Sequence, residues 1–122
     1  MKIILTATSP SIDSNIDARF GRGAHLIVVD SDTLEWQAHP NPGVGAPGGA
    51  GTLAAQFVAN QHAEAVISGD FGPNAYGALQ AAGVAMYLFG ASTTVKEAME
   101  HFRAGQLEHV GAPTGQGHHP RG

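Results

Sequence analysis

The sequence contains no cysteine, and only 13% of its residues are charged. Without cysteine the chain can form neither a disulfide nor a thiolate metal site, so a bound metal would need histidine, carboxylate or backbone groups, or would bring its own ligands. The chain also lacks a run of 18 apolar residues and a signal-peptide pattern at its start. We therefore expect a soluble, cytoplasmic protein with no membrane partner.

Basic residues are scarce, with six lysines and arginines against ten acidic residues. This mildly negative balance argues against general binding to nucleic acid, and an anionic ligand would need a local positive site. A length of 122 residues suits one domain with a real core. We expect that domain to cover residues 1–108 and a flexible tail to cover residues 109–122, where His118 and His119 lie.

Apolar and β-branched runs alternate with helical patterns along the chain. The runs predict strands at 2–8, 25–30, 33–39, 65–68 and 84–89. Helical stripes predict helices that begin near residues 51, 73 and 94, the last with Thr94 and Glu97 at capping-box spacing. The order β-β-β-α-β-α-β-α predicts an α/β domain of three layers with a mixed five-stranded sheet, whose third strand is a half-exposed edge.

The glycine-rich stretch 43–51 runs directly into the first predicted helix. Free amides and the positive end of a helix dipole favour a bound anion there, although a plain connector explains the glycines equally well. The stretch also fits the dinucleotide pattern G-x-G-x-x-G. We discount that match because Pro40 and Pro42 separate it from a probable edge strand, whereas the motif needs a tight turn after a central strand.

A loop at 12–23 carries Arg19 and Arg22 on either side of Phe20. Arginine suits oxyanions and polyanionic clusters, although one of the two could instead pair with Asp13 or Asp17. Phe20 is better interpreted as a core residue. In an open α/β sheet, ligands gather where strands end and helices begin. That edge would collect the loops at 9–23, 40–51, 69–74 and 90–93.

Two side-chain sets could bind metal ions directly. His25 and His39 begin and end a predicted hairpin, where antiparallel pairing could make them face each other as an incomplete metal site. Carboxylates could instead serve a two-metal nuclease or phosphoryl-transfer enzyme. The acids considered for that alternative are Asp13, Asp17, Asp30 and Asp70.

Several segments resemble one known family as a set. They are 17–22 (Asp-Ala-Arg-Phe-Gly-Arg), 48–51 (Gly-Gly-Ala-Gly), 68–75, 82–84, 95–98 and 105–107. Together they are similar to the dinitrogenase iron-molybdenum cofactor biosynthesis family. That family includes nitrogenase cofactor carriers and the orange proteins of sulfate reducers, which hold a molybdenum-copper-sulfide cluster noncovalently. The resemblance implies a ribonuclease H-like domain and a carrier rather than an enzyme.

The resemblance also implies a site without thiolates, because a cluster with its own sulfides needs only a basic pocket lined by amides. Among the nitrogenase carriers a histidine often precedes the Phe-Gly pair, where this chain has Arg19, so charge pairing would replace ligation. The candidate cofactor-binding residues are Arg19, Phe20, Gly21, Arg22, Gly48, Gly49, Ala50, Gly51, Gly69, Gly72 and Asn74. The implied partners are an anionic metallocluster and its protein donor or recipient, including cell-division or ATPase proteins if the chain is orange protein-like.

Overall fold

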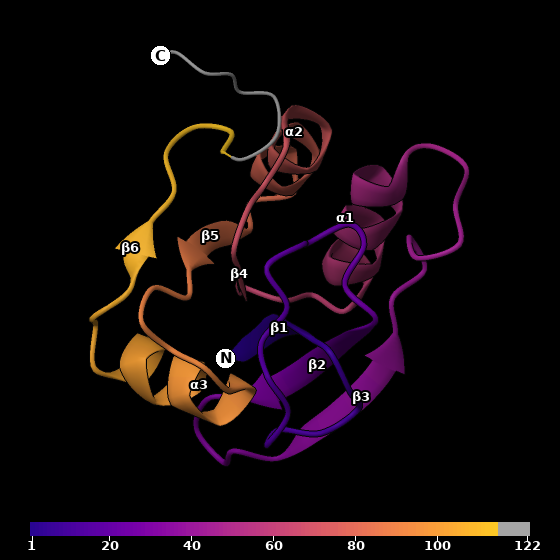
Figure 1. Cartoon of the computed structure of the whole chain (residues 1–122). Helices are drawn as coiled ribbons and strands as arrows, with labels where there is room; N and C mark the ends of the chain where they lie inside the picture. Colours follow the sequence, from indigo (N-terminus) through magenta and orange to yellow (C-terminus); the bar gives the residue numbers. More distant parts are fainter. Residues whose placement is uncertain (115–122) are drawn as a thin grey trace.

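A computed structural model describes residues 1–114 as a mixed sheet with helices on both faces (Figure 1). The strands are β1 (Lys2–Ala7), β2 (His25–Asp30), β3 (Trp36–Pro40), β4 (Ala65–Ser68), β5 (Ala85–Leu88) and β6 (Glu108–His109). The helices are α1 (Ala50–Asn60), α2 (Pro73–Ala81) and α3 (Val95–Arg103).

The sheet has the order β3-β2-β1-β4-β5-β6. Strands β1, β4 and β5 run parallel, and the other three pair antiparallel with their neighbours. The central strands β1 and β4 are almost wholly buried, as their continuous apolar runs predict. Strand β3 lies at one edge with its side chains exposed or half-buried, which confirms the edge position predicted for it.

Helices cover the two faces of the sheet separately. Helices α1 and α2 pack on one face through Ala54, Val58 and Leu79, in a core that includes both Phe20 and Phe71. Helix α3 packs on the other face through Val95, Ala98 and Met99. The helix starts fall at the carboxyl edge of the parallel strands, where α/β sheets bind ligands.

Residues 108–114 change two of the expectations from sequence. Strand β6 pairs with Tyr87 and Leu88 of β5, so the sheet has six strands and the expected count of five is wrong. The domain boundary placed after residue 108 falls inside this strand, and Val110 is only 5% exposed. The remainder of the expected tail, including His118 and His119, lies outside the described residues. The ribonuclease H-like label stays a prediction.

None of the three described helices has the length and apolar character needed to cross a bilayer.

Helix α3 has the capping box predicted for it. The Thr94 side chain accepts a hydrogen bond from the Glu97 amide at 3.1 Å, and the Glu97 carboxylate accepts one from the Thr94 amide. The start of α3 is therefore fully satisfied: the Glu97 amide donates to the Thr94 side chain, and the Val95 and Lys96 amides donate to the carbonyls of Ser14 and Ile12.

Candidate functional site

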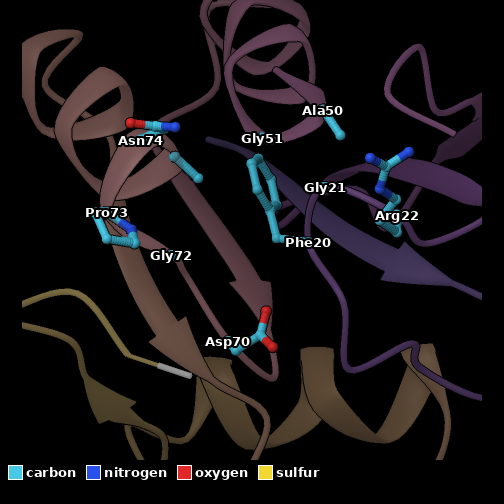
Figure 2. Close-up of a pocket in the computed structure, with 10 residues that line it drawn as sticks. Phe20, Gly21, Arg22, Ala50, Gly51, Asp70, Gly72, Pro73 and Asn74 are labelled. Carbon is cyan, nitrogen blue, oxygen red and sulfur yellow. The ribbon is translucent and has the colours of Figure 1, made fainter. Parts of the chain in front are cut away.

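A hollow of about 310 Å³ opens between the starts of α1 and α2 (Figure 2). Figure 2 shows Phe20 between the two helix starts, with Arg22 and Asp70 on different sides of it. The hollow is lined by Phe20, Gly21, Arg22, Ala50, Gly51, Asp70, Gly72, Pro73, Asn74 and Ala75. It lies at the carboxyl edge of the sheet. There the loop at residues 12–23, which we call the arginine loop, meets the starts of α1 and α2, each preceded by glycine.

The two helices that open onto the hollow have uncapped starts. Helix α1 follows Gly49, whose φ of 70° is left-handed, and α2 follows Gly72 with Pro73 in its first turn. Neither helix has a side-chain cap or an acidic residue in its first turn. The amides of these first turns are thus available to an anion, in contrast to the capped start of α3.

Glycines let three backbone segments meet beside the hollow. A Cβ on Gly21 would lie 2.9 Å from the Gly51 nitrogen, and a Cβ on Gly43 would lie 2.6 Å from the Ala50 carbonyl oxygen. A Cβ on Gly51 would meet the Ala75 methyl at 3.1 Å, which explains how closely α1 and α2 approach. These glycines are therefore required for close packing.

Asn41 links the arginine loop to the glycine-rich stretch, a role that sequence patterns did not indicate. Its side chain is buried, donates to the Phe20 carbonyl at 2.9 Å and accepts from the Gly43 amide at 3.0 Å. Asn41 lies between two prolines and belongs to no strand or helix pattern, so only the folded structure shows its two hydrogen bonds. Asn41 thus fixes the backbone of Gly43 to that of Phe20, which lines the hollow.

Both arginines have protein partners. The Arg19 guanidinium pairs with the carboxylate of Asp17 at 3.2 and 3.3 Å, while the Arg19 side chain is 64% exposed. Arg22 donates to the Ala46 carbonyl at 2.9 Å and, at 3.4 Å, to the carbonyls of Gly43 and Val44. Of the two, only Arg22 lines the hollow, and within residues 1–114 no carboxylate forms an ion pair with it.

Asp70 is the one acidic residue on the wall of the hollow. Burial raises the pKa of its carboxyl above the usual range, and the negative charge of Asp17 acts in the same direction. A hydrogen bond from the Phe20 backbone and the charge of Arg19 lower the pKa of Asp70 by less than burial raises it. The fold therefore favours the protonated form of a group that would repel an anion when ionised.

Phe20 and Phe71 are core residues as well as neighbours of the site. They are 1% and 0% exposed, and their ring centroids lie 5.5 Å apart. The interpretation of Phe20 as a core residue is confirmed. Since Phe20 also lines the hollow, it gives the site an apolar floor.

The structure brings together seven of the residues predicted for cofactor binding. They are Phe20, Gly21, Arg22, Ala50, Gly51, Gly72 and Asn74. Arg19, Gly48, Gly49 and Gly69 do not line the hollow, although Gly49 is the N-terminal capping residue of α1 and Gly69 packs directly on the Ala18 backbone. Asp70 also lines it, although the sequence patterns had not placed it among the cofactor-binding residues.

The two histidines do not come together. His25 is paired with Pro40, and His39 is paired with Leu26, one position out of register. Since neighbouring residues of a strand point to opposite faces, the side chains of His25 and His39 lie on opposite sides of the sheet. The expectation that they face each other is wrong. His39 packs against Phe57 of α1 with ring centroids 5.2 Å apart.

The carboxylates of the nuclease hypothesis are also dispersed. Asp30 pairs with Lys2 at the amino-terminal end of β1, whereas Asp70 follows the carboxyl end of the parallel strand β4. Asp30 and Asp70 are thus at opposite edges of the sheet. Within residues 1–114 no three histidine, cysteine, aspartate or glutamate side chains come close enough to hold a metal ion. The geometry does not favour the two-metal alternative.

Comparisons with known proteins agree with this geometry. A high-resolution structure of the apo form of the orange protein from Desulfovibrio gigas matches at TM-score 0.88 and 36% identity, covering 93% of this chain and 96% of that chain. The NMR structure of a Thermotoga protein of the DUF35 family matches at TM-score 0.81 and 28% identity, covering 95% and 98%. An uncharacterized protein of Methanocaldococcus jannaschii is 28% identical over 112 residues, which cover 88% of this chain and 94% of that protein.

Residues 1–105 match the family model described as dinitrogenase iron-molybdenum cofactor. This match spans both helix starts, the arginine loop and the whole hollow. It confirms the resemblance drawn from the glycine and arginine motifs. The chain belongs to the dinitrogenase iron-molybdenum cofactor family.

Proposed function

We propose that this chain binds an anionic metal-sulfide cluster in the hollow and carries it as cargo, without catalysing a reaction. The observation that carries the proposal is the contrast among the three helix starts. Helices α1 and α2 open onto the hollow without a side-chain cap or a first-turn acid, whereas Thr94 and Glu97 cap α3. Uncapped amides at the positive end of two helix dipoles favour an anion between them.

The chemistry of the lining supports a cluster that brings its own ligands. The chain has no cysteine, and the hollow offers amides, one guanidinium and an apolar floor. We propose a molybdenum-copper-sulfide cluster as the cargo, with an iron-molybdenum cofactor-like cluster as the second candidate. Family membership and the likeness to the orange protein support cofactor binding or carriage. A carrier would also need protein donors and recipients of its cargo.

An order-of-magnitude sum is consistent with a carrier. A helix start contributes up to about 2 kcal/mol to a partly buried anion, so the two helix starts supply about 4 kcal/mol, the equivalent of millimolar binding. Micromolar binding needs about 8 kcal/mol. The charge of Arg22 and contact with the apolar floor formed by Phe20 would have to supply the difference.

Reconstitution of the apoprotein tests the proposed function. The purified protein is mixed with tetrathiomolybdate and a copper salt, desalted, and assayed for molybdenum, copper and a charge-transfer band in the visible spectrum. We expect a stoichiometric coloured complex to survive desalting. Loss of both metals on the column would contradict the proposal, and magnesium-dependent hydrolysis of phosphodiesters would favour an enzyme instead.

Replacing Arg22 with alanine should weaken cluster retention about tenfold, since one charge-assisted contact contributes roughly 1.5 kcal/mol. The same change at Arg19 should affect retention less, because its guanidinium is paired with Asp17 outside the hollow. Release rates measured by timed desalting compare the two variants. Equal rates for both variants and the wild type would remove the arginines from the site.

Replacing Asp70 with asparagine should strengthen cluster binding at neutral pH and flatten its pH dependence. In the wild type, the raised pKa means that Asp70 gains a proton as the pH falls toward its ordinary range, which removes a charge that repels the anion. Wild-type binding should therefore tighten as the pH falls. Titrations from neutral pH down toward the ordinary carboxyl range, near a pKa of about 4, check the sign. An equally steep pH dependence in the variant would contradict the role of Asp70.

The same substitution should also affect the apoprotein. A carboxyl whose folded-state pKa is raised stabilises the fold at low pH, and this contribution is lost as the pH rises through the folded-state pKa. Asp70→Asn should thus raise the free energy of unfolding at pH 7 and leave it nearly unchanged at pH 3.5, roughly where the acid is protonated in both states. Denaturant titrations of the variant and the wild type at both pH values measure these free energies of unfolding.

A further inference from the structure

The segment formed by residues 108–114 follows the part of the chain that matches the family, which ends at residue 105. We call this segment the clasp. Its Val110 is buried against the core of α1 and α2 and donates to the Met86 carbonyl at 2.8 Å. The hydroxyl of Tyr76 in α2 donates to the Gly111 carbonyl at 2.8 Å. The clasp is thereby fixed to β5 and to one of the two helices that form the hollow.

Thr114, at the end of the clasp, pairs with the backbone of Phe71 in both directions. The Phe71 amide donates to the Thr114 hydroxyl at 2.8 Å, and the Thr114 amide donates to the Phe71 carbonyl at 2.7 Å. Phe71 is fully buried, so its backbone groups need protein partners. The described structure supplies both through Thr114.

Phe71 lies between two residues of the hollow. Asp70 and Gly72 line it, and Gly72 is the N-terminal capping residue of α2. A shift of the Phe71 backbone would move the Asp70 carboxylate and the first amides of α2 together. The hydroxyl of Thr114 therefore helps to fix one wall of the hollow, although Thr114 does not itself line the hollow.

We propose that Thr114 is a positioning residue for cluster retention, which acts by holding the Asp70–Gly72 turn in place. The inference rests on the proposed function and extends the site beyond the family match, to the clasp. Loss of the hydroxyl would leave the buried Phe71 amide unpaired and the wall free to move. The expected consequence is faster release of the cargo.

The test compares Thr114→Val, which removes the hydroxyl at nearly constant shape, with Thr114→Ser, which keeps it. Release of the tetrathiomolybdate-copper species is followed by timed desalting, and hydrogen exchange of the Phe71 amide by NMR. We expect Thr114→Val to release metal about tenfold faster, the equivalent of one lost hydrogen bond, and to exchange the Phe71 amide faster. Thr114→Ser should match the wild type in both measurements.

Thr94→Ala is the control for a general loss of stability, because it removes the cap of α3 on the opposite face of the sheet. It should leave release unchanged. Equal acceleration by Thr94→Ala, or release from Thr114→Val within twofold of the wild type, would overturn the role of Thr114. A wild-type protein that retained no metal would overturn the proposed function itself, and the inference with it.

Discussion

Replacing Asn74 with aspartate is expected to weaken binding of a tetrathiomolybdate-copper cluster about 100-fold while making the apoprotein more stable. Asn74 is exposed, follows Pro73 in the first turn of α2 and lines the hollow. An acid there complements the helix dipole and should stabilise the fold by about 0.3 to 1 kcal/mol. The same charge roughly 5 Å from an anion costs about 3 kcal/mol at an effective dielectric constant of 20. Thermal melts and binding titrations should thus move in opposite directions.

Lys96→Asp provides a matched control on α3. Lys96 is exposed and has the same place in its helix as Asn74 has in α2, two residues after the N-terminal capping position. The control alters the net charge by a larger amount but lies on the opposite face of the sheet. We expect it to leave cluster binding almost unchanged. A similar loss of binding in both variants would point to net charge rather than to a site at the start of α2.

Replacing Gly43 with alanine is expected to destabilise the apoprotein by about 2 to 3 kcal/mol and to weaken cluster binding at least about tenfold. The new Cβ would lie 2.6 Å from the Ala50 carbonyl oxygen and would also collide with the Gly21 carbonyl oxygen. Both contacts are with backbone, so the variant can relieve them only by moving the backbone at residue 43 apart from Gly21 and from Ala50. Denaturant unfolding measures the first effect and timed desalting the second.

Gly45→Ala is the control for Gly43→Ala. No atom lies within 4 Å of a Cβ placed on Gly45, and its φ is not in the left-handed region. Alanine there should leave stability unchanged or raise it by less than about 1 kcal/mol, because it restricts the unfolded chain. Equal losses in both variants would mean that the stretch needs glycine for flexibility rather than for the close contact with Ala50 and Gly21.

Strong local patterns predicted most of the fold. The apolar runs at 25–30 and 65–68 match β2 and β4, and Thr94 with Glu97 correctly marked the start of α3. Strand β6 could not be found, because two polar residues, Glu108 and His109, have no strand pattern and pair only where β5 offers a free edge. Short strands of this kind depend on tertiary contacts alone.

The histidine pairing failed because His25 and His39 are on opposite faces in either register of the hairpin. A two-residue turn at Ser31 and Asp32 would pair His25 with Ala38. The chain instead turns through residue 35, with Leu34 in a left-handed conformation at φ 65°, and His25 pairs with Pro40. In both cases His39 is next to the residue opposite His25, and neighbouring residues of a strand point to opposite faces.

The parts of the site formed by backbone amides were predictable from the sequence. The contacts of its side chains were less predictable. Glycine followed by a helical pattern located the starts of α1 and α2, since glycine before a helix exposes its amides. The sequence did offer Asp17 as a partner for one arginine, and the structure pairs it with Arg19. The partners of Arg22 were not predictable. Arg22 bonds to carbonyls more than twenty residues away in the chain, a contact that no local pattern encodes.

The amide resonances of the apoprotein, followed by NMR while the tetrathiomolybdate-copper species is added, test the central claim most directly. If the cargo binds between the two uncapped helix starts, the largest shifts will be those of Ala50, Gly51 and Asn74. The amide resonances of Lys96 and Glu97, at the capped start of α3, will not shift. Shifts concentrated at the start of α3 or along β3, with Ala50 and Asn74 unchanged, would contradict the account.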